Sequence, residues 1–329
     1  MSAHRLSGLL ILLVLLLFVG SLLVGPAALD PLAGIGGLFA GGEEATIVIM
    51  REIRLPRALL GLIVGTSLGI AGAALQGFLR NPLAEPGLIG VSATASLGAV
   101  LVFYSGLAGA SMLALPAGAL AGALAAVLII LTIAAGNTTT LTLILAGVAL
   151  SSLSGALTSL ALNLSPNPFA SYEIIFWLLG SLKDRSMVHV WLSLPLMAVG
   201  WALILASSRA LDALTFGEAT AASLGINLPR ARLSIVCGVA LAVGAGTAVT
   251  GAVGFIGLVV PHLIRPLTDR MPSSLLVPSG LGGAALLLAA DIAARLVVPA
   301  RELNVGVLTA LIGAPFFLWL VIRSRREVM

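Results

Sequence analysis

The sequence predicts an all-α fold, a polytopic membrane protein with about ten transmembrane helices. Hydrophobic residues make up 59% of the 329 positions and charged residues 9%, whereas soluble domains average roughly half and about a quarter. Apolar stretches of about 20 residues, the length that crosses a bilayer, also follow one another along the whole chain. The polar patches between them are too short for a soluble domain. We therefore expect residues 1–329 to form a single transmembrane domain.

Hydropathy sets the expected spans. They lie near residues 6–25, 57–78, 88–106, 112–135, 140–162, 188–206, 230–250, 254–267, 275–298 and 305–322. The first follows His4 and Arg5 and lacks a convincing cleavage site before Pro26, so we interpret it as a retained helix. An even number of spans places both termini on one side, and the basic tail at residues 323–326 marks that side as cytoplasmic.

The expected span at residues 254–267 is too short for a full crossing. Pro261, His262, Arg265 and Pro266 interrupt it, and such broken segments line cavities or protein interfaces rather than lipid. We interpret His262 as a residue that stabilises this turn, and a haem or metal ligand is the alternative. The histidines are remote from one another and form no His-Glu-x-x-His pattern, so we expect no metal site and no cofactor.

A short repeat predicts internal symmetry. Leu55-Pro56-Arg57-Ala58 opens the second expected span, and Leu228-Pro229-Arg230-Ala231 opens the seventh. The crossings between them place the two copies in opposite orientations, as in the inverted-topology repeats of many transporters. Chance similarity between two apolar helices is the alternative.

Several arginines fall on the expected outer face, where the bias of membrane insertion disfavours them. They are Arg51, Arg54, Arg57, Arg295 and Arg301. An acidic docking partner would explain them. Alternatively they snorkel, or pair with the neighbouring Glu43, Glu44, Glu52 and Glu302. The basic residues behind the net charge of +4 are scattered singly among apolar segments. We therefore expect the chain to contact membrane lipid and not to bind nucleic acid.

Asp291 is the acidic residue that falls well inside an expected span. Arg295 lies four residues later, which places both side chains on one helix face and permits a salt bridge. A structural pair and a functional pair both fit this spacing.

Enzyme chemistry finds little support in the sequence. Lys183 is the only lysine, so the Gly-Lys-Ser/Thr sequence of a phosphate-binding P-loop cannot occur. A serine nucleophile with a histidine on a neighbouring span is not evident either. We expect a transport component that does not itself hydrolyse ATP.

The longest expected cytoplasmic loop contains the stretch Leu214–Gly225. We predict one or two short helices there, with Gly217 and Gly225 as breaks. A short helix presented to the cytoplasm could contact a soluble motor protein.

Motifs in a fixed order cover nearly the whole chain. They are Arg54-Leu55-Pro56-Arg57; Gln76 followed by Arg80-Asn81-Pro82-Leu83-Ala84 and Pro86-Gly87-Leu88-Ile89-Gly90; Phe176-Trp177 with Gly180-Ser181; Ala222 to Gly225; Gly254-Phe255-Ile256-Gly257-Leu258-Val259-Val260-Pro261-His262 with Arg265; Asp291 to Arg295; and Gly306 to Gly313-Ala314-Pro315-Phe316. Together they resemble the permease subunits of type II ABC importers for iron chelates (siderophores and haem) and cobalamin.

The resemblance implies a homodimer of ten-helix permease subunits in the bacterial inner membrane, with the translocation path on the two-fold axis. Two cytoplasmic ATP-binding subunits and a periplasmic substrate-binding protein would complete the assembly. Arg54, Arg57 and Arg295 match the family's periplasmic arginines, which receive glutamates of the binding protein. The segment that matches the ATPase-coupling helices contains Thr215, Phe216, Gly217, Glu218, Ala222, Leu224 and Gly225. By position alone, the gate-forming region contains Thr138, Thr142, Leu160 and Asn163.

The predicted function is import of a siderophore, haem or cobalamin from periplasm to cytoplasm, driven by ATP hydrolysis in the partner ATPase. An ion-coupled secondary transporter of a small organic solute is the alternative, and it would need acidic groups at the bilayer midplane. Asp291, with Arg295 beside it, is a poor candidate for that role. The sequence does not distinguish the three substrates.

Overall fold

The computed structural model describes residues 3–25, 30–39, 44–111, 113–134, 139–165, 168–297 and 303–326. Within these ranges the regular secondary structure is entirely helical. The predicted all-α fold class is therefore confirmed. The helices are α1 (Ala3–Leu23), α2 (Pro31–Phe39), α3 (Ala45–Val48), the π-helical turn η1 (Ile49–Arg54), α4 (Leu55–Phe78), η2 (Pro86–Ile89), α5 (Val91–Tyr104), η3 (Leu107–Gly109), α6 (Ala114–Ala134), α7 (Thr140–Asn163), α8 (Pro168–Leu178), α9 (Met187–Ala206), α10 (Ser208–Leu214), α11 (Glu218–Ser223), α12 (Leu228–Thr250), α13 (Ile256–Ile264), η4 (Arg265–Leu267), α14 (Pro272–Val297) and α15 (Val305–Arg326).

Seven helical segments of the described chain are long and apolar enough to cross a membrane, and three shorter apolar helices accompany them. The shorter ones lie at 91–104, 256–267 and 305–320. Each of the ten segments overlaps one range predicted from hydropathy, which supports the polytopic membrane fold. Hydropathy missed α2 and α8, because helices of 9 and 11 residues are too short to register as spans.

The second predicted span begins earlier than expected. Residues 45–78 form one helical run of 34 residues, roughly 50 Å long at 1.5 Å per residue, and so longer than the hydrocarbon core. Pro56 does not start this run. Because proline has no N–H to donate to the preceding turn, the wider π-helical turn η1 precedes it, and the helix continues through the proline.

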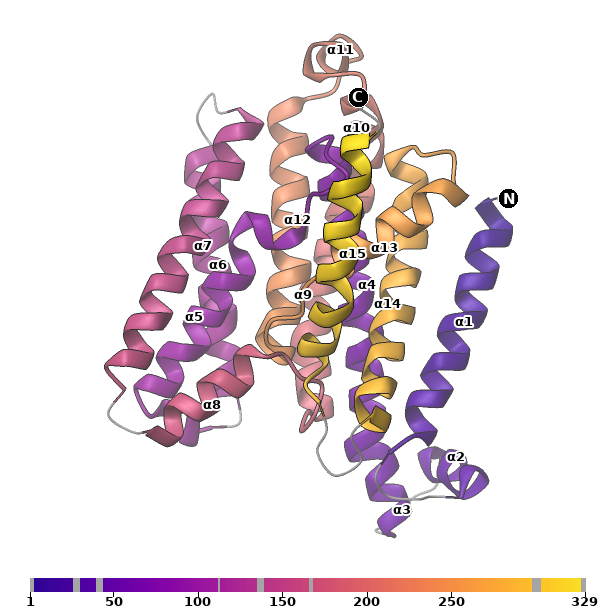
Figure 1. Cartoon of the computed structure of the whole chain (residues 1–329), viewed down its shortest axis with the longest axis vertical. Coiled ribbons are helices and arrows are strands. Elements are labelled where there is room, and N and C mark those ends of the chain that lie inside the picture. Colours follow the sequence, from indigo (N-terminus) through magenta and orange to yellow (C-terminus); the bar gives the residue numbers. More distant parts are fainter. Residues whose placement is uncertain are drawn as a thin grey trace.

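The helices form a bundle with two distinct ends (Figure 1). The α11 end carries α10 and α11, and α15 ends there. The opposite α3 end carries α2, α3 and α8. Helix α1 runs from the side of the α11 end toward the α3 end, so the start of α1 and the end of α15 lie on the same side of the bundle. Helices α4 and α12 are mostly buried at the centre, whereas α1 and α7 expose most of their apolar side chains, as a lipid-facing surface requires.

Glycines bring α4 into close contact with its neighbours. A Cβ at Gly69 would lie 1.9 Å from the carbonyl oxygen of Ser279 on α14, and one at Gly72 would lie 1.9 Å from that of Gly257 on α13. Such backbone approach is how membrane helices gain packing contacts without a hydrophobic drive between them. This packing fixes the position of α14, which carries Asp291, against α4.

The two copies of the predicted repeat run in opposite directions. Helix α4 leaves the α3 end, and α12 leaves the α11 end, beside α11 (Figure 1). An inverted repeat requires this arrangement.

Two short helices follow breaks in the longer helices: α5 follows a turn and the 3-10 helix η2, and α13 follows a non-helical segment at 251–255. Glu85, in the segment before α5, accepts a hydrogen bond of 2.6 Å from the backbone N–H of Phe255, in the segment before α13. Phe255 has a positive φ of 68°, and the carboxylate satisfies its N–H. The broken span predicted at 254–267 is thus present as a 9-residue helix followed by a 3-10 turn, and the protein itself supplies the partner of the Phe255 N–H that precedes this helix.

Candidate functional site

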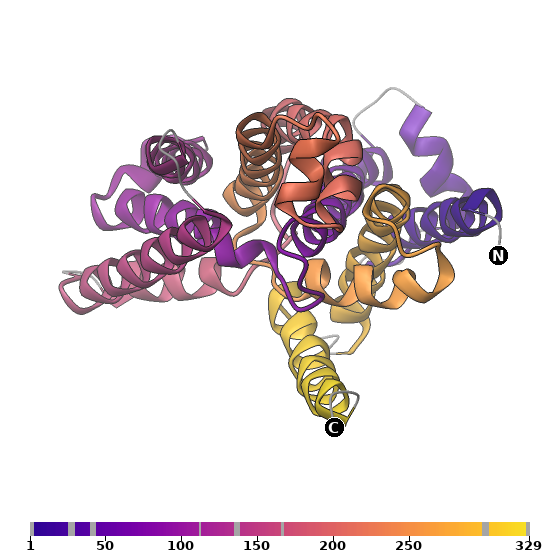
Figure 2. The same ribbon diagram turned by 90° about the horizontal axis from the view of Figure 1, so that it is seen from above.

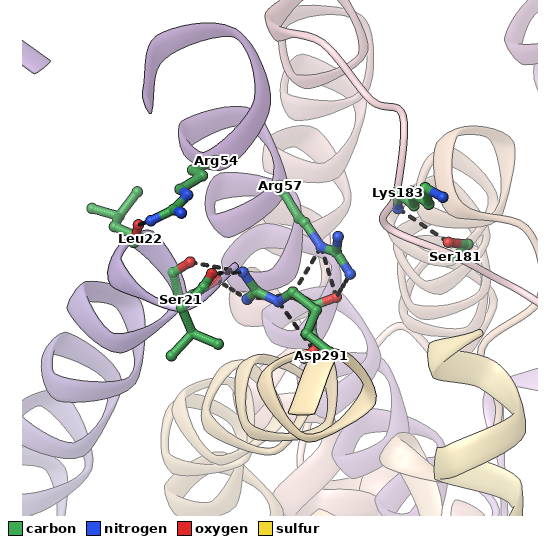
Figure 3. A network of polar contacts seen from close by, with 9 residues as sticks. Ser21, Leu22, Arg54, Arg57, Ser181, Lys183 and Asp291 are labelled. Carbon is green, nitrogen blue, oxygen red and sulfur yellow. Dashed lines mark hydrogen bonds and ion pairs between the residues drawn. The ribbon is translucent and has the colours of Figure 1, made fainter. Parts of the chain in front are cut away.

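Three predicted site residues meet near the α3 end. Arg57 on α4 donates from Nε and Nη2 to Asp291 on α14, at 3.0, 3.1 and 2.8 Å. Arg295, one turn further along α14, donates to Asp291 Oδ2 at 2.8 Å. All three are buried, with Asp291 only 1% exposed. We call Arg57, Asp291 and Arg295 the neutralised cluster, because one carboxylate lies between two guanidinium groups and offsets part of their charge (Figure 3).

Helix α1 closes the neutralised cluster from the other side. Arg295 donates to the hydroxyl of Ser21 at 2.7 Å and to its carbonyl oxygen at 2.9 Å. Arg54, the third predicted docking arginine, donates to the carbonyl oxygens of Leu22 and Leu23 at 2.8 and 2.9 Å. These carbonyls end α1 and need partners. The arginines therefore tie together α1, α4 and α14.

Sequence spacing predicted the Asp291–Arg295 pair, and the structure confirms it at 2.8 Å. Sequence spacing did not predict the Arg57–Asp291 pair, whose members are 234 residues apart. The predicted docking arginines are also more deeply buried than side chains placed for a partner would be, at 4% to 8% exposed. Part of their charge is used inside the chain, and docking stays a prediction.

A recess of about 410 Å³ opens beside the neutralised cluster. We call it the α3-end recess. Its charged lining residues are Arg54, Arg57, Lys183, Arg185, Arg295, Glu52 and Asp184. Five cations face two carboxylates there. Figure 3 shows Lys183 on the side of Arg57 opposite Arg54, so cationic side chains lie on both sides of Arg57. A recess with excess positive charge can accept an acidic side chain.

The predicted coupling segment forms the short helix α11 between two glycines. Gly217 has φ 98° and Gly225 has φ 82°, the left-handed region in which glycine is unstrained. Phe216 and Leu224 flank the helix and are 66% and 64% exposed. Ala222 is exposed as well, and the Thr215 hydroxyl is held by the Asp212 carbonyl at 2.6 Å. The segment is a small, partly apolar protrusion at the α11 end.

Glu218 fixes α11 to two long helices. Its carboxylate accepts a hydrogen bond of 2.9 Å from the Thr140 hydroxyl on α7 and pairs with Arg232 on α12 at 2.7 Å. The Thr140 hydroxyl is the main cause that lowers the pKa of Glu218, with Arg232 and Arg80 acting in the same direction against partial burial. Glu218 is thus ionised at neutral pH, and α11 is anchored electrostatically to α7 and α12.

The predicted gate residues lie on or beside α7. Thr138 lies outside the described residues. Thr142 is in the first turn, where its backbone N–H bonds the Thr139 hydroxyl at 3.3 Å. Leu160, 51% exposed, and Asn163 are at the far end of the same helix. Thr140 contacts Glu218 and so connects the first turn of α7 to α11. The position of Thr140 in the sequence did not predict this contact.

His262 packs against an aromatic side chain of α15. Its ring lies 5.8 Å from that of Phe316 in an edge-to-face arrangement. Among the described residues, no three His, Cys, Asp or Glu side chains come together in a way that could hold a metal ion. The contact joins α13 to α15, which fits the interpretation of His262 as a structural residue.

Comparisons with known proteins agree with this architecture. Residues 12–323 match the model of the FecCD transport family. The Fe(3+) dicitrate transport system permease protein FecD of Escherichia coli K12 is 42% identical over 86% of this chain and 88% of that protein. The vitamin B12 import system permease protein BtuC of Vibrio cholerae is 41% identical over 98% of this chain and 95% of that protein.

A solved structure shares the fold along almost the whole chain. It is described as an inward-facing conformation of a putative metal-chelate type ABC transporter. It is 30% identical in sequence, has a TM-score of 0.85, and the alignment covers 97% of this chain and 99% of that one. The chain therefore belongs to the FecCD transport family, as a permease subunit of the ABC transporters for iron chelates and cobalamin.

Proposed function

We propose that this chain forms the membrane path of an ABC importer, which moves an iron chelate, haem or cobalamin into the cytoplasm while a partner subunit hydrolyses ATP. The observation that carries the proposal is α11. It protrudes between two left-handed glycines, exposes Phe216 and Leu224, and is anchored to α7 and α12 through Glu218. This arrangement suits a helix that a partner protein pushes as a rigid body.

The proposed coupling runs through Glu218. When the ATP-binding subunits close, they would displace α11, and its bonds to Thr140 and Arg232 would carry the displacement into α7 and α12. Helix α7 holds the predicted gate residues Thr142, Leu160 and Asn163. A movement of α7 is therefore the step that would open or close the path on the cytoplasmic side.

The path would lie on the face shared with a second copy of the chain. Seen from the α11 end, α7 and α15 project from the body on two different sides, with α13 near the base of α15 (Figure 2). An apolar hollow of about 600 Å³ lies between α15, the end of α8 and residues 252–255. Phe169, Tyr172 and Phe176 of α8 are 62% to 77% exposed. Apolar, exposed side chains around a hollow fit a homodimer that encloses a large organic substrate.

In this arrangement the α11 end is cytoplasmic and the α3 end faces the periplasm of the inner membrane. The substrate-binding protein would dock at the α3-end recess and place acidic side chains among Arg54, Lys183 and Arg185. Because Arg57 and Arg295 already share Asp291, such carboxylates would add to the existing network rather than meet unengaged cations.

The alternative function, ion-coupled secondary transport, would depend on Asp291 as the ion-binding residue. Asp291 would have to exchange a proton or cation during transport. Both of its carboxylate oxygens accept hydrogen bonds from guanidinium groups instead, so Asp291 is already occupied by partners within the chain.

The test is uptake by proteoliposomes that contain the chain, the ATP-binding subunit and the binding protein of the same system. Cobalamin, ferric citrate and haemin are supplied separately on the binding-protein side. We expect one of them to accumulate only when ATP is inside. Uptake that requires an ion gradient and no ATP would overturn the proposal.

Docking at the recess is tested by reversing one charge. Arg54→Glu should weaken binding of the substrate-binding protein by about tenfold or more, because it places a like charge against the incoming carboxylate. Arg51→Glu is the matched control, since Arg51 is exposed on the same helical run and does not line the recess. Equal affinities for the two variants, measured by titration in nanodiscs, would exclude the recess as the docking site.

A further inference from the structure

A second arginine group lies at the α11 end. Arg80, Arg265 and Arg270 line a recess of about 190 Å³, together with Thr215 and parts of α4 and α14. We call it the arginine pocket. At ~30 Å³ per water molecule, its volume is enough for a carboxylate and the carbons that carry it. It is formed where the loops after α4 and after α13 meet the beginning of α14.

The carboxylates of the described chain act on the arginine pocket only from a distance, as Glu218 does on Arg80, whose charge helps to lower the pKa of Glu218. None of its three guanidinium groups forms an ion pair within those residues. Three acidic side chains of the described residues at this end have other partners. Glu218 binds Arg232 and Thr140, Asp212 accepts from the Ser273 N–H, and Asp269 accepts from the Met271 N–H and the Ser274 hydroxyl.

The arginine pocket is held in place before any ligand arrives. Arg265 donates from Nη2 to Gln76 Oε1 at 2.7 Å, and the Gln76 amide donates in turn to the Gly257 and Leu258 carbonyls of α13. The Nε–H of Arg265 is buried and has no acceptor, which is unfavourable for a charged donor.

Arg80 and Arg270 also occupy strained backbone conformations, with φ 50° and 68°. Such conformations are rare outside glycine and cluster at functional sites. Three guanidinium groups that converge on one recess, one of them with an unsatisfied buried N–H, suit an anionic ligand.

The surroundings favour a protein ligand over a free anion or a lipid headgroup. Thr215 is part of the lining and leads directly into α11, and the position of a Cβ on Gly217 would be 3.8 Å from Arg80. Phe216 beside it and Leu267 beside Arg265 are 66% and 47% exposed. Exposed apolar side chains around a charged pocket are typical of a protein interface with a polar anchor.

We propose that the arginine pocket binds an aspartate or glutamate side chain of the ATP-binding partner subunit, as a second attachment point beside α11. The inference rests on the proposed function, in which that subunit docks at the α11 end. The carboxylate accepts the unused Arg265 N–H and pairs with Arg270 and Arg80. It holds the partner against α4, α13 and α14, while α11 contacts it from the side of α7 and α12.

The test exploits the chain's single lysine. Arg270→Lys keeps the charge and places an amine in the pocket, and Lys183, the one native lysine, lines the recess at the opposite end. A zero-length carbodiimide joins an amine to a carboxylate in contact with it. In nanodiscs that hold the full-length permease with its ATP-binding subunit, we expect a crosslink from residue 270 to one acidic residue of the ATPase, identified by mass spectrometry. Arg209→Lys on α10 is the matched control, since Arg209 is exposed and outside the lining.

Affinity gives an independent measurement. Arg265→Gln should weaken binding of the ATPase by about tenfold or more, and added salt should reduce the difference from the wild-type chain. Arg209→Gln should bind as the wild type does. Thermal unfolding of both variants shows whether they remain folded, and Arg270→Lys tests the same pocket with its charge intact.

Each outcome decides between the two proposals. One outcome overturns the pocket while the proposed function stands. In it, the ATPase binds and couples normally to the wild type and to both variants, Arg265→Gln and Arg270→Lys, and Arg270→Lys forms no crosslink. A wild-type chain that binds no ATPase overturns both. Unchanged ATPase binding combined with loss of bound anionic lipid from Arg265→Gln would assign the pocket to a lipid headgroup and overturn the protein ligand.

Discussion

Two groups of three arginines lie at opposite ends of this protein and differ in how their charge is balanced. At the α3 end, Arg54, Arg57 and Arg295 are buried, and Asp291 lies between the last two. At the α11 end, Arg80 and Arg270 are exposed, Arg265 is half-buried, and no ion pair within the described residues balances them. The first group uses its charge to join helices. The second keeps its charge available to a partner.

The difference follows from burial. A guanidinium inside a membrane helix bundle needs a counter-charge or several acceptors, because its desolvation is not otherwise compensated. At an end that faces water, solvent supplies this compensation until a partner replaces it. Substitutions should therefore affect chiefly the stability of the chain at the neutralised cluster, and chiefly binding at the arginine pocket.

The largest effect is expected from Asp291→Asn. It leaves two buried guanidinium groups without their carboxylate, and breaking a buried ion pair in this way costs about 3–5 kcal/mol. Equilibrium unfolding in mixed micelles measures the loss. Asp184→Asn makes the same change at an exposed position of the same end. It should change the free energy of unfolding by no more than about 0.5 kcal/mol, and the same holds for Arg270→Gln. If Asp291→Asn lowered the free energy of unfolding by less than about 1 kcal/mol, the two arginine groups would not differ in their contribution to stability.

A smaller effect is expected from Arg57→Lys. Lysine keeps the charge but lacks the planar fork with which Arg57 binds both oxygens of Asp291. Loss of one hydrogen bond to a charged group gives a destabilisation of about 1.5–3 kcal/mol. In an Asp291→Asn background the same substitution should have little further effect, because the shared carboxylate is already gone. Additive losses in this double-mutant cycle would show that Arg57 acts through other contacts.

The sequence predicts what depends on local spacing. Helix periodicity places Asp291 and Arg295 on one face, and Gly217 and Gly225 mark the ends of α11, since both occupy backbone conformations that favour glycine. Hydropathy likewise locates the helices, because each long apolar run must cross the bilayer.

Contacts between distant segments could not be predicted in the same way. Arg57 meets Asp291 because glycines on α4 let α14 approach, and nothing in the spacing of one helix encodes its partner. The arginine pocket needs two loops and the beginning of α14 to converge, so Arg80, Arg265 and Arg270 look like separate surface residues in the sequence. The contact between Thr140 and Glu218, 78 residues apart, depends on the folded bundle for the same reason.

The smallest expected effect concerns Glu218, the carboxylate that could have neutralised the arginine pocket but is held by Thr140 and Arg232 instead. Because its pKa is lowered from the usual 4.5, its ionised form stabilises the anchored α11. That contribution is present above pH 4.5 and is lost as the pH falls through the lower pKa of the folded state. Thr140→Val removes the main cause of the shift, so the midpoint of the loss should move up toward 4.5.

The mobility of a spin label on Leu224→Cys, in a Cys237→Ala background, reports this midpoint. Thr142→Val is the control, because the Thr142 hydroxyl bonds Thr139 on the same turn and does not reach Glu218. If the Thr140 and Thr142 variants titrate together, Thr140 does not hold the carboxylate. Glu218 would then be able to turn toward Arg80, and the arginine pocket would have an internal counter-charge after all.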